Sequence, residues 1–293
     1  MVPLSLEQAD QAHRNLVEAT WEFIRRFPRA HREAWPEATA FRSGVPVPDA
    51  NQLILPAPPG DVKALVGRAR RFFPSGYPFE ILSPAPGERD PFAGFPSAGS
   101  GPALRLPGMW MDLPLSFPSP PAGLSVRTVA DREGLSDFRR VMGSVYHIPA
   151  GFLRIVFPGS ALRGDGSAAR VRLILGYAGP RPVAGSVLVA TDGIAGVYWV
   201  ATDLRQRRRG YGEAVTWAAL AAGEELGARA GFLQASPLGR PVYERMGFRT
   251  VLEYQPWQPL RPRLDRMRTG LRLLGSVLAS SLRRAPVPSS TGP

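Results

Sequence analysis

An arginine- and glycine-rich turn between an apolar strand and an alanine-rich helix could bind an anion. The segment from Val197 to Gly223 reads VYWVATDLRQRRRGYGEAVTWAALAAG, and its centre carries arginines at 205 and at 207–209. A helix predicted to begin near Gly212 would present unpaired N–H groups and a positive dipole potential to this turn. Gly210 and Gly212 remove side chains where a ligand would approach the backbone, and the arginines add charge and forked donors. These features predict a site for a pyrophosphate.

The spacing of this turn separates it from two other phosphate-binding motifs. It reads Arg207-x-x-Gly210-x-Gly212 directly after a strand. It has neither the Gly-Lys-Ser/Thr ending of a P-loop nor the GxGxxG of a dinucleotide-binding turn. Three further segments follow in order: a predicted strand GFLQAS, a short helical segment PLGRPVYERMGF and a predicted strand RTVLEYQPW.

With this order of segments, the chain from Leu124 to Trp257 resembles the GNAT acetyltransferase superfamily, whose acetyl-CoA signature is Gln/Arg-x-x-Gly-x-Gly/Ala. The resemblance implies an α/β (α+β) GNAT fold, in which helices flank a mixed, mostly antiparallel sheet. It also implies an N-acetyltransferase that moves an acetyl group from acetyl-CoA to an amine acceptor by direct attack in a ternary complex. The residues that the resemblance assigns to the co-substrate acetyl-CoA are Val200, Ala201, Thr202, Arg207, Arg208, Arg209, Gly210, Tyr211, Gly212 and Glu213.

The resemblance gives these groups separate tasks. The backbone of the strand that ends at Thr202 would hydrogen-bond the pantetheine arm, and the Val200 N–H would face the developing oxyanion. The N–H groups from Arg208 through Glu213 would hold the pyrophosphate. Tyr243 lies where many members keep the tyrosine that protonates the departing thiolate, and a phenol with a pKa near 10 suits that task. Packing beneath the cofactor is the alternative role for Tyr243.

The acceptor side carries weaker signals. Tyr146 and His147 lie at the end of the first predicted helix after Leu124, a region that lines the acceptor pocket in the family. The ordinary pKa of histidine suits a general base, but a lone histidine is more often a surface or packing residue. The acceptor stays open between a small amine, an aminoglycoside-like antibiotic, an amino acid and a peptide or protein terminus.

The first part of the chain repeats part of this pattern. A strand NQLILP, a helix over 61–73, a strand PFEILS and a strand PGMWMDLP follow the order of the second half of a GNAT domain. No Arg-x-x-Gly-x-Gly follows its first strand. We therefore expect residues 1–118 to form a smaller, degenerate α/β GNAT-like domain that does not hold CoA. The proline-rich connector 113–123 would separate it from the GNAT domain of 124–257.

The C-terminal segment, residues 258–293, combines leucines at helical spacing with arginines. It predicts a basic amphipathic helix followed by a disordered tail, and the helix either docks on the N-terminal domain or makes peripheral contact with an anionic membrane. The chain has no run of about 18 apolar residues that could span a membrane. Its start lacks the pattern of a signal peptide. We expect a cytoplasmic protein.

Composition excludes several other classes. The sequence has no cysteine and only three scattered histidines, which predicts no metal site. The net charge of +12 invites a nucleic-acid partner, but the arginines are not interleaved with aromatic stacking residues. We therefore rank nucleic-acid binding third, behind an N-acetyltransferase and a non-catalytic acyl-CoA-binding regulatory module. The oligomeric state stays open.

Overall fold

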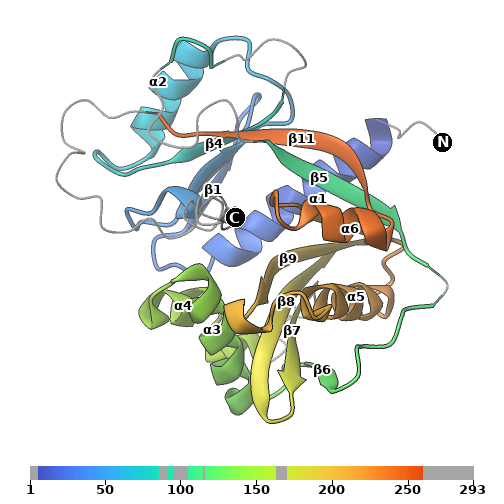
Figure 1. Ribbon diagram of the computed structural model, residues 1–293. Helices are drawn as coiled ribbons and strands as arrows, with labels where there is room; N and C mark the ends of the chain where they lie inside the picture. Colours follow the sequence, from blue (N-terminus) through green and yellow to red (C-terminus); the bar gives the residue numbers. More distant parts are fainter. Residues whose placement is uncertain (1–5, 86–91, 96–104, 115, 163–169, 260–293) are drawn as a thin grey trace, which may run out of the picture.

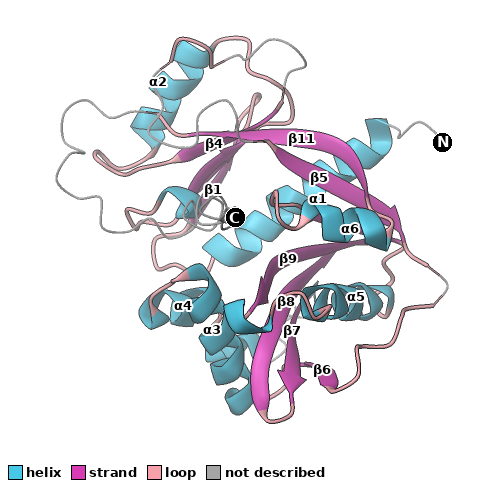
Figure 2. Cartoon of the chain, viewed as in Figure 1, coloured by secondary structure: helices cyan, strands magenta, loops and turns pink. Residues whose placement is uncertain are grey.

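The computed structural model of the chain describes residues 6–85, 92–95, 105–114, 116–162 and 170–259 (Figure 1). Within these ranges the strands form one 11-stranded sheet, with helices on both faces (Figure 2). The strands in chain order are β1 His31–Ala34, β2 Thr39–Arg42, β3 Asn51–Ile54, β4 Glu80–Pro84, β5 Leu106–Asp112, β6 Leu124–Thr128, β7 Val171–Ala178, β8 Arg181–Thr191, β9 Ile194–Thr202, β10 Ala230–Gln234 and β11 Arg249–Trp257. The α-helices are α1 Leu6–Ile24, α2 Val62–Phe72, α3 Arg132–Tyr146, α4 Ala150–Val156, α5 Tyr211–Glu224 and α6 Arg240–Met246.

Counted outward from the two central strands, the succession of antiparallel and parallel pairings is nearly the same on both sides of the sheet. The full order is β1-β2-β3-β4-β11-β5-β10-β9-β8-β7-β6. All neighbours are antiparallel except β3 with β4 and β9 with β10, which are parallel. The central strands β11 and β5 pair with each other. On one side β11 is antiparallel to β4, which is parallel to β3, and on the other side β5 is antiparallel to β10, which is parallel to β9. The sheet is therefore mixed and mostly antiparallel, as predicted, and its two halves repeat one pattern.

The first half contains the predicted elements and two that the sequence analysis missed. The predicted order of strand, helix, strand and strand is confirmed as β3, α2, β4 and β5. The strands β1 and β2 lie between residues 28 and 50, where the sequence analysis named no helix or strand. The sequence HREA of β1 is polar and mostly exposed, because β1 is an edge strand and charged side chains protect such edges from further pairing.

The two halves exchange their last strands. β5, from the first half, lies between β10 and β11 of the second half, and β11 lies between β5 and β4. The sheet is thus continuous across the connector 113–123, so each half completes the sheet of the other. The division into domains at 118 and 124 stays a prediction.

Helices cover both faces of the sheet, and one face carries helices from both halves. α1 lies across the middle of one face (Figure 1), where Leu16 and Val17 pack among residues of both halves such as Ile54 and Phe232. α3 and α4 cover the same face farther along, over β7, β8 and β9. α5 packs on the other face, where its Val215 belongs to a separate apolar cluster. The strand β9 therefore has α1 and α3 on one side and α5 on the other.

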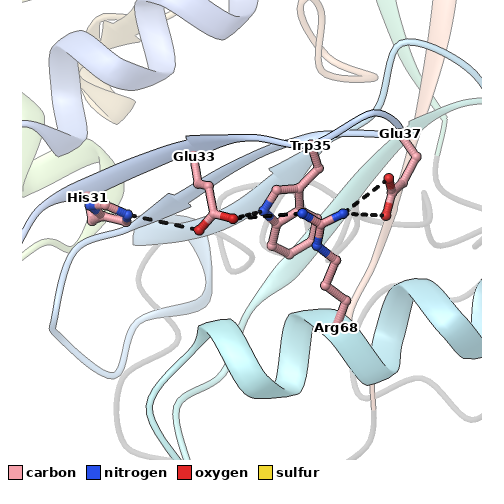
Figure 3. A network of polar contacts seen from close by, with 5 residues as sticks. All are labelled: His31, Glu33, Trp35, Glu37 and Arg68. Atoms are coloured by element: carbon pink, nitrogen blue, oxygen red, sulfur yellow. Dashed lines mark hydrogen bonds and ion pairs between the residues drawn. The ribbon is translucent and has the colours of Figure 1, made fainter.

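A polar network ties the edge hairpin of β1 and β2 to α2 (Figure 3). The Arg68 guanidinium lies 4.2 Å from the centre of the Trp35 ring. It also contacts the carboxylates of Glu33, at 3.7 Å, and Glu37, at 3.4 Å. The Trp35 indole N–H donates to Glu33 at 2.8 Å. These exposed contacts fasten the sheet edge far from the arginine-glycine turn.

Two expectations fall partly or wholly on residues outside the described ranges. The predicted helix of 258–293 lies outside them except for its first two residues, and the predicted tail lies wholly outside them. No helix in the described part of the chain is both long and apolar enough to cross a bilayer.

Candidate active site

The strand β9 changes its neighbours where the predicted site begins. Its parallel pairing with β10 runs from Ile194–Ala230 to Val197–Leu233, and beyond that pair β9 continues to Thr202. The two strands therefore pair only over the first part of β9. The backbone of the remaining part, which includes Val200, Ala201 and Thr202, lies beyond the last β10 partner.

A bulge occurs in β9 directly after this point. The register with β8 shifts between Gly185 and Val187, so that Trp199 and Val200 lie opposite a single β8 residue. Such a bulge bends a strand and re-aims its side chains. Trp199 has a φ of 53°, an unusual value for a bulky aromatic residue. As a result the Trp199 ring joins the cluster on the α3 face, while Val200 packs toward α5.

The arginine-glycine turn connects β9 to α5 and leaves the helix start without a side-chain cap. Arg208, at φ 64°, and Gly210, at φ 75°, both have left-handed backbone conformations. Gly210 is the N-cap residue of α5 and supplies no capping side chain. By contrast, α2 and α3 begin at Asp61 and Asp131, whose carboxylates accept backbone N–H bonds of 2.9 and 2.7 Å. The first N–H groups of α5 are thus available to an external anion.

The side chains around this turn are also suited to an anion. Arg205, Arg207, Arg208 and Arg209 are exposed, and within the described residues none of them forms an ion pair. Asp203, the nearest carboxylate in sequence, accepts the backbone N–H of Arg205 at 2.8 Å. The turn therefore concentrates positive charge that the described protein does not neutralise.

Gly212 brings the helix start against the end of β9. A Cβ at this position would lie 3.1 Å from Thr202 Oγ1 and 4.0 Å from Val200 Cγ1. The predicted pantetheine strand and the predicted pyrophosphate turn are therefore adjacent in space. Tyr211, beside it, is buried in the cluster under α5, and Glu213 is half-buried in the first helical turn.

Tyr243 lies on α6 and points into the core beside α5. Its side chain is 8% exposed, and it hydrogen-bonds to Thr216, whose own hydroxyl donates to the Gly212 carbonyl at 2.8 Å. Burial raises the pKa of the Tyr243 phenol to about 12, and the hydrogen bond to Thr216 acts in the opposite direction. Tyr243 is thus protonated at neutral pH and connected through one residue to the glycine turn.

Tyr146 and His147 have different surroundings. Tyr146 is the last residue of α3, and its hydroxyl donates to the Val200 carbonyl at 2.8 Å. Burial raises the pKa of the Tyr146 phenol, and the nearby Tyr243 raises it further by a smaller amount. The charge of Arg207 acts in the opposite direction. Tyr146 therefore lies among the predicted cofactor residues. His147 is exposed and ends α3 in a left-handed conformation, with φ 54°.

Three residues near the site were missed by sequence reasoning. Thr216 hydrogen-bonds to Tyr243, and the Trp199 ring packs edge-on against the Tyr146 ring. Gln234, at the end of β10, has a buried Nε2 atom without a hydrogen-bond partner in the described structure. An unsatisfied buried donor is costly, and a polar ligand between the ends of β9 and β10 would satisfy it. The sequence signal for Gln234 was a polar residue at the end of the predicted strand GFLQAS.

Comparisons with known proteins agree on the fold. No family model matches the chain, and no curated protein matches its sequence. Among solved structures, the chain is similar to a GCN5-related N-acetyltransferase from Kribbella flavida, with a TM-score of 0.60 and 19% identity over 86% of this chain and 97% of that one. It is also similar to a functionally unknown conserved protein from Staphylococcus epidermidis, with a TM-score of 0.56 and 13% identity over 80% and 95% of the two chains.

A third similar structure is a GCN5-related N-acetyltransferase from Sphaerobacter thermophilus, with a TM-score of 0.54 and 14% identity over 84% of this chain and 85% of that one. These shares of the chain are too large for residues 124–257 alone, so the likeness includes the first half. The chain therefore has the fold of the GCN5-related N-acetyltransferases, or GNAT fold, in both of its halves.

Proposed function

We propose that the protein is an N-acetyltransferase that uses acetyl-CoA and an amine acceptor. One observation carries this proposal: the uncapped N-terminus of α5, with its arginines, directly follows the part of β9 that has lost its β10 partner. An uncapped helix start accommodates a pyrophosphate. A strand without a neighbour on one side accommodates an extended chain that carries amide groups. Acetyl-CoA has both parts in this order.

The residues of the chain fit this co-substrate. The backbone of Val200, Ala201 and Thr202 would pair with the pantetheine amides. The N–H groups from Arg208 to Glu213 would hold the pyrophosphate, and the exposed arginines would neutralise its charge. In the described part of the first half, the helix α2 does not offer an equivalent site, because Asp61 already caps it. We therefore propose one cofactor site per chain.

Acetyl-CoA supplies an activated acyl group, and the protein would stabilise the charge that develops during its transfer. As the amine attacks the thioester carbonyl, negative charge moves to the carbonyl oxygen, which the Val200 N–H would face. The departing sulfur would then accept a hydrogen bond from Tyr243, whose hydroxyl would turn from Thr216 to the sulfur. A free thiol has a pKa of about 8.5, so full proton transfer from a phenol near 12 is uphill by about 5 kcal/mol. Tyr243 would therefore act mainly as a hydrogen-bond donor.

The residues on the acceptor side also fit one alternative function. The Tyr146 hydroxyl is committed to a backbone carbonyl, and His147 is exposed at the end of α3. Neither is placed as a clear general base, which is consistent with a non-catalytic acyl-CoA-binding regulatory module. Release of free thiol from acetyl-CoA that depends on an added amine distinguishes the enzyme from this module.

Calorimetric titration with acetyl-CoA tests the cofactor site directly. In Gly212→Val the branched side chain would lie between the helix start and the end of β9, against Thr202 and Val200. We therefore expect affinity to fall by at least about 100-fold, or about 2.8 kcal/mol. Gly67→Val is the matched control, since Gly67 lies within α2, where the nearest atom to an added Cβ is 3.8 Å away. Unchanged affinity in Gly212→Val would disprove the assigned site.

A further inference from the structure

The bulge in β9 requires support from the rest of the protein. Trp199, at φ 53°, occupies a left-handed backbone region that is unfavourable for a residue other than glycine. Such a conformation persists only where surrounding contacts hold it. The relevant contacts are those made by Trp199 and by Val200, the two residues that form the bulge.

Tyr146 contacts both of these residues. Its ring packs edge-on against the Trp199 ring, with centroids 5.5 Å apart. Its hydroxyl donates to the Val200 carbonyl at 2.8 Å. The Trp199 ring is also held by Phe23 of α1, at 5.9 Å, and by Phe157 after α4, at 5.3 Å. The aromatic contacts are therefore shared among three residues, whereas the polar contact comes from Tyr146.

These contacts restrict the peptide that carries the Val200 N–H. That N–H belongs to the peptide between Trp199 and Val200. The Trp199 ring is fixed on one side of this peptide, and the Val200 carbonyl is fixed on the other. Rotation of the Val200 backbone would break the hydrogen bond to Tyr146. A planar peptide leaves the chain two soft dihedrals per residue, so fixing both flanks leaves the N–H little freedom.

We propose that Tyr146 is a positioning residue that aims the Val200 N–H at the thioester carbonyl, through the Val200 carbonyl and the Trp199 ring. This inference rests on the proposed function and adds a residue to it. Donors aimed in advance stabilise developing charge without reorganisation. Tyr146 does not touch the acetyl group in this assignment, and its proton stays on the phenol.

Isotope-edited infrared spectroscopy tests this role without an acceptor. Acetyl-CoA labelled with 13C at the acetyl carbonyl is bound to the full-length protein, and its carbonyl stretch is compared with that of free acetyl-CoA in water. In the unmodified protein we expect a shift to lower frequency, because the Val200 N–H polarises the carbonyl. Tyr146→Phe keeps the ring and removes only the hydroxyl, so we expect it to lose most of this shift while its acetyl-CoA affinity is unchanged.

Tyr177→Phe is the matched control. Tyr177 is a buried tyrosine of β7 whose hydroxyl donates to Asp137 at 3.0 Å, away from the bulge. It should lose comparable stability and keep the full carbonyl shift. With an amine that the protein accepts, Tyr146→Phe should lower kcat about tenfold, the value of one neutral hydrogen bond, with an unchanged pH profile. Tyr177→Phe should leave kcat unchanged.

The outcomes separate this inference from the proposed function. If acetyl-CoA binds and Tyr146→Phe keeps the carbonyl shift, Tyr146 does not position the N–H and the inference is wrong, while the cofactor site stands. A changed pH profile or a raised acceptor KM with unchanged kcat would make Tyr146 an acid-base or acceptor-binding group and would also overturn it. If the unmodified protein does not bind acetyl-CoA, both the proposed function and the inference fail.

Discussion

Replacing Gly196 by alanine should break the hydrogen bonds that join α1 to β8 and β9. An added Cβ would lie 2.0 Å from the Asn15 Oδ1 atom and 2.7 Å from the Tyr198 ring. Asn15 is fully buried on α1. Its Nδ2 donates to the Val189 carbonyl at 3.1 Å and to Thr191 Oγ1 at 2.6 Å. Its Oδ1 accepts the Tyr198 hydroxyl proton at 2.6 Å.

The expected cost follows from these three hydrogen bonds. The alanine methyl cannot coexist with the Asn15 amide, so the amide must move and all three bonds are lost. At about 1 kcal/mol each, Gly196→Ala should lower the free energy of unfolding by about 3 kcal/mol. Urea denaturation measures this as a lower midpoint with an unchanged slope.

A double-mutant cycle tests the cause. Asn15→Ala loses the same hydrogen bonds and should cost about the same as Gly196→Ala. It also removes the clash with Asn15 and opens space into which the Tyr198 ring, 2.7 Å from the added Cβ, can shift. The double variant should therefore be about as stable as Asn15→Ala alone, which gives a coupling of about 3 kcal/mol. Gly67→Ala in α2 is the control, and it should gain about 0.5–1 kcal/mol, because alanine is the better helix former. Additive losses in the cycle, or a negligible cost of Gly196→Ala, would refute the reasoning.

Two further predictions concern catalysis and assembly. Tyr243→Phe should lower turnover about 10- to 100-fold and leave acetyl-CoA affinity unchanged, since a donor to the departing sulfur acts in the transition state. Steady-state kinetics with an accepted amine measures turnover, and calorimetry measures affinity. Unchanged turnover would assign Tyr243 to packing. Fragments 1–118 and 124–293 should each lack cooperative unfolding, because β5 and β11 are exchanged between the halves. An equimolar mixture of the two should unfold cooperatively, as followed by circular dichroism. A 124–293 fragment that unfolds cooperatively by itself would contradict this.

Local patterns in the sequence predicted much of the second half of the fold. The strands β7, β8 and β9 are long and apolar, and the turn before α5 has a distinctive composition. The edge strand β1 and its neighbour β2 were missed because each has four residues and β1 buries almost nothing. The exchange of β5 and β11 could not be predicted either, since it depends on pairing between residues more than a hundred positions apart, such as Trp110 with Arg249.

The candidate site shows the same division. The turn at Arg207–Gly212 was found because its chemistry depends on residue types in a fixed local spacing. The contact of Tyr146 with Val200 joins α3 to a bulge in β9, and no local pattern encodes that bulge. The residue type of Trp199 does not predict a left-handed conformation, because aromatic residues rarely adopt one. Sequence reasoning placed Tyr146 near the site but gave it a role in acceptor binding that nothing in the structure tests.

The two halves also explain why a shared strand pattern need not produce two cofactor sites. In both halves a parallel strand pair is connected through a helix, α2 in the first and α5 in the second. The N-terminus of α2 receives a carboxylate from Asp61, which is part of the chain and satisfies the N–H of Ala64. The N-terminus of α5 receives no side chain, because Gly210 stands at the cap position. One half thus supplies its own anion, while the other leaves its N–H groups and arginines to a ligand. A difference at the cap residue, more than any difference in fold, would restrict acetyl-CoA to the second half.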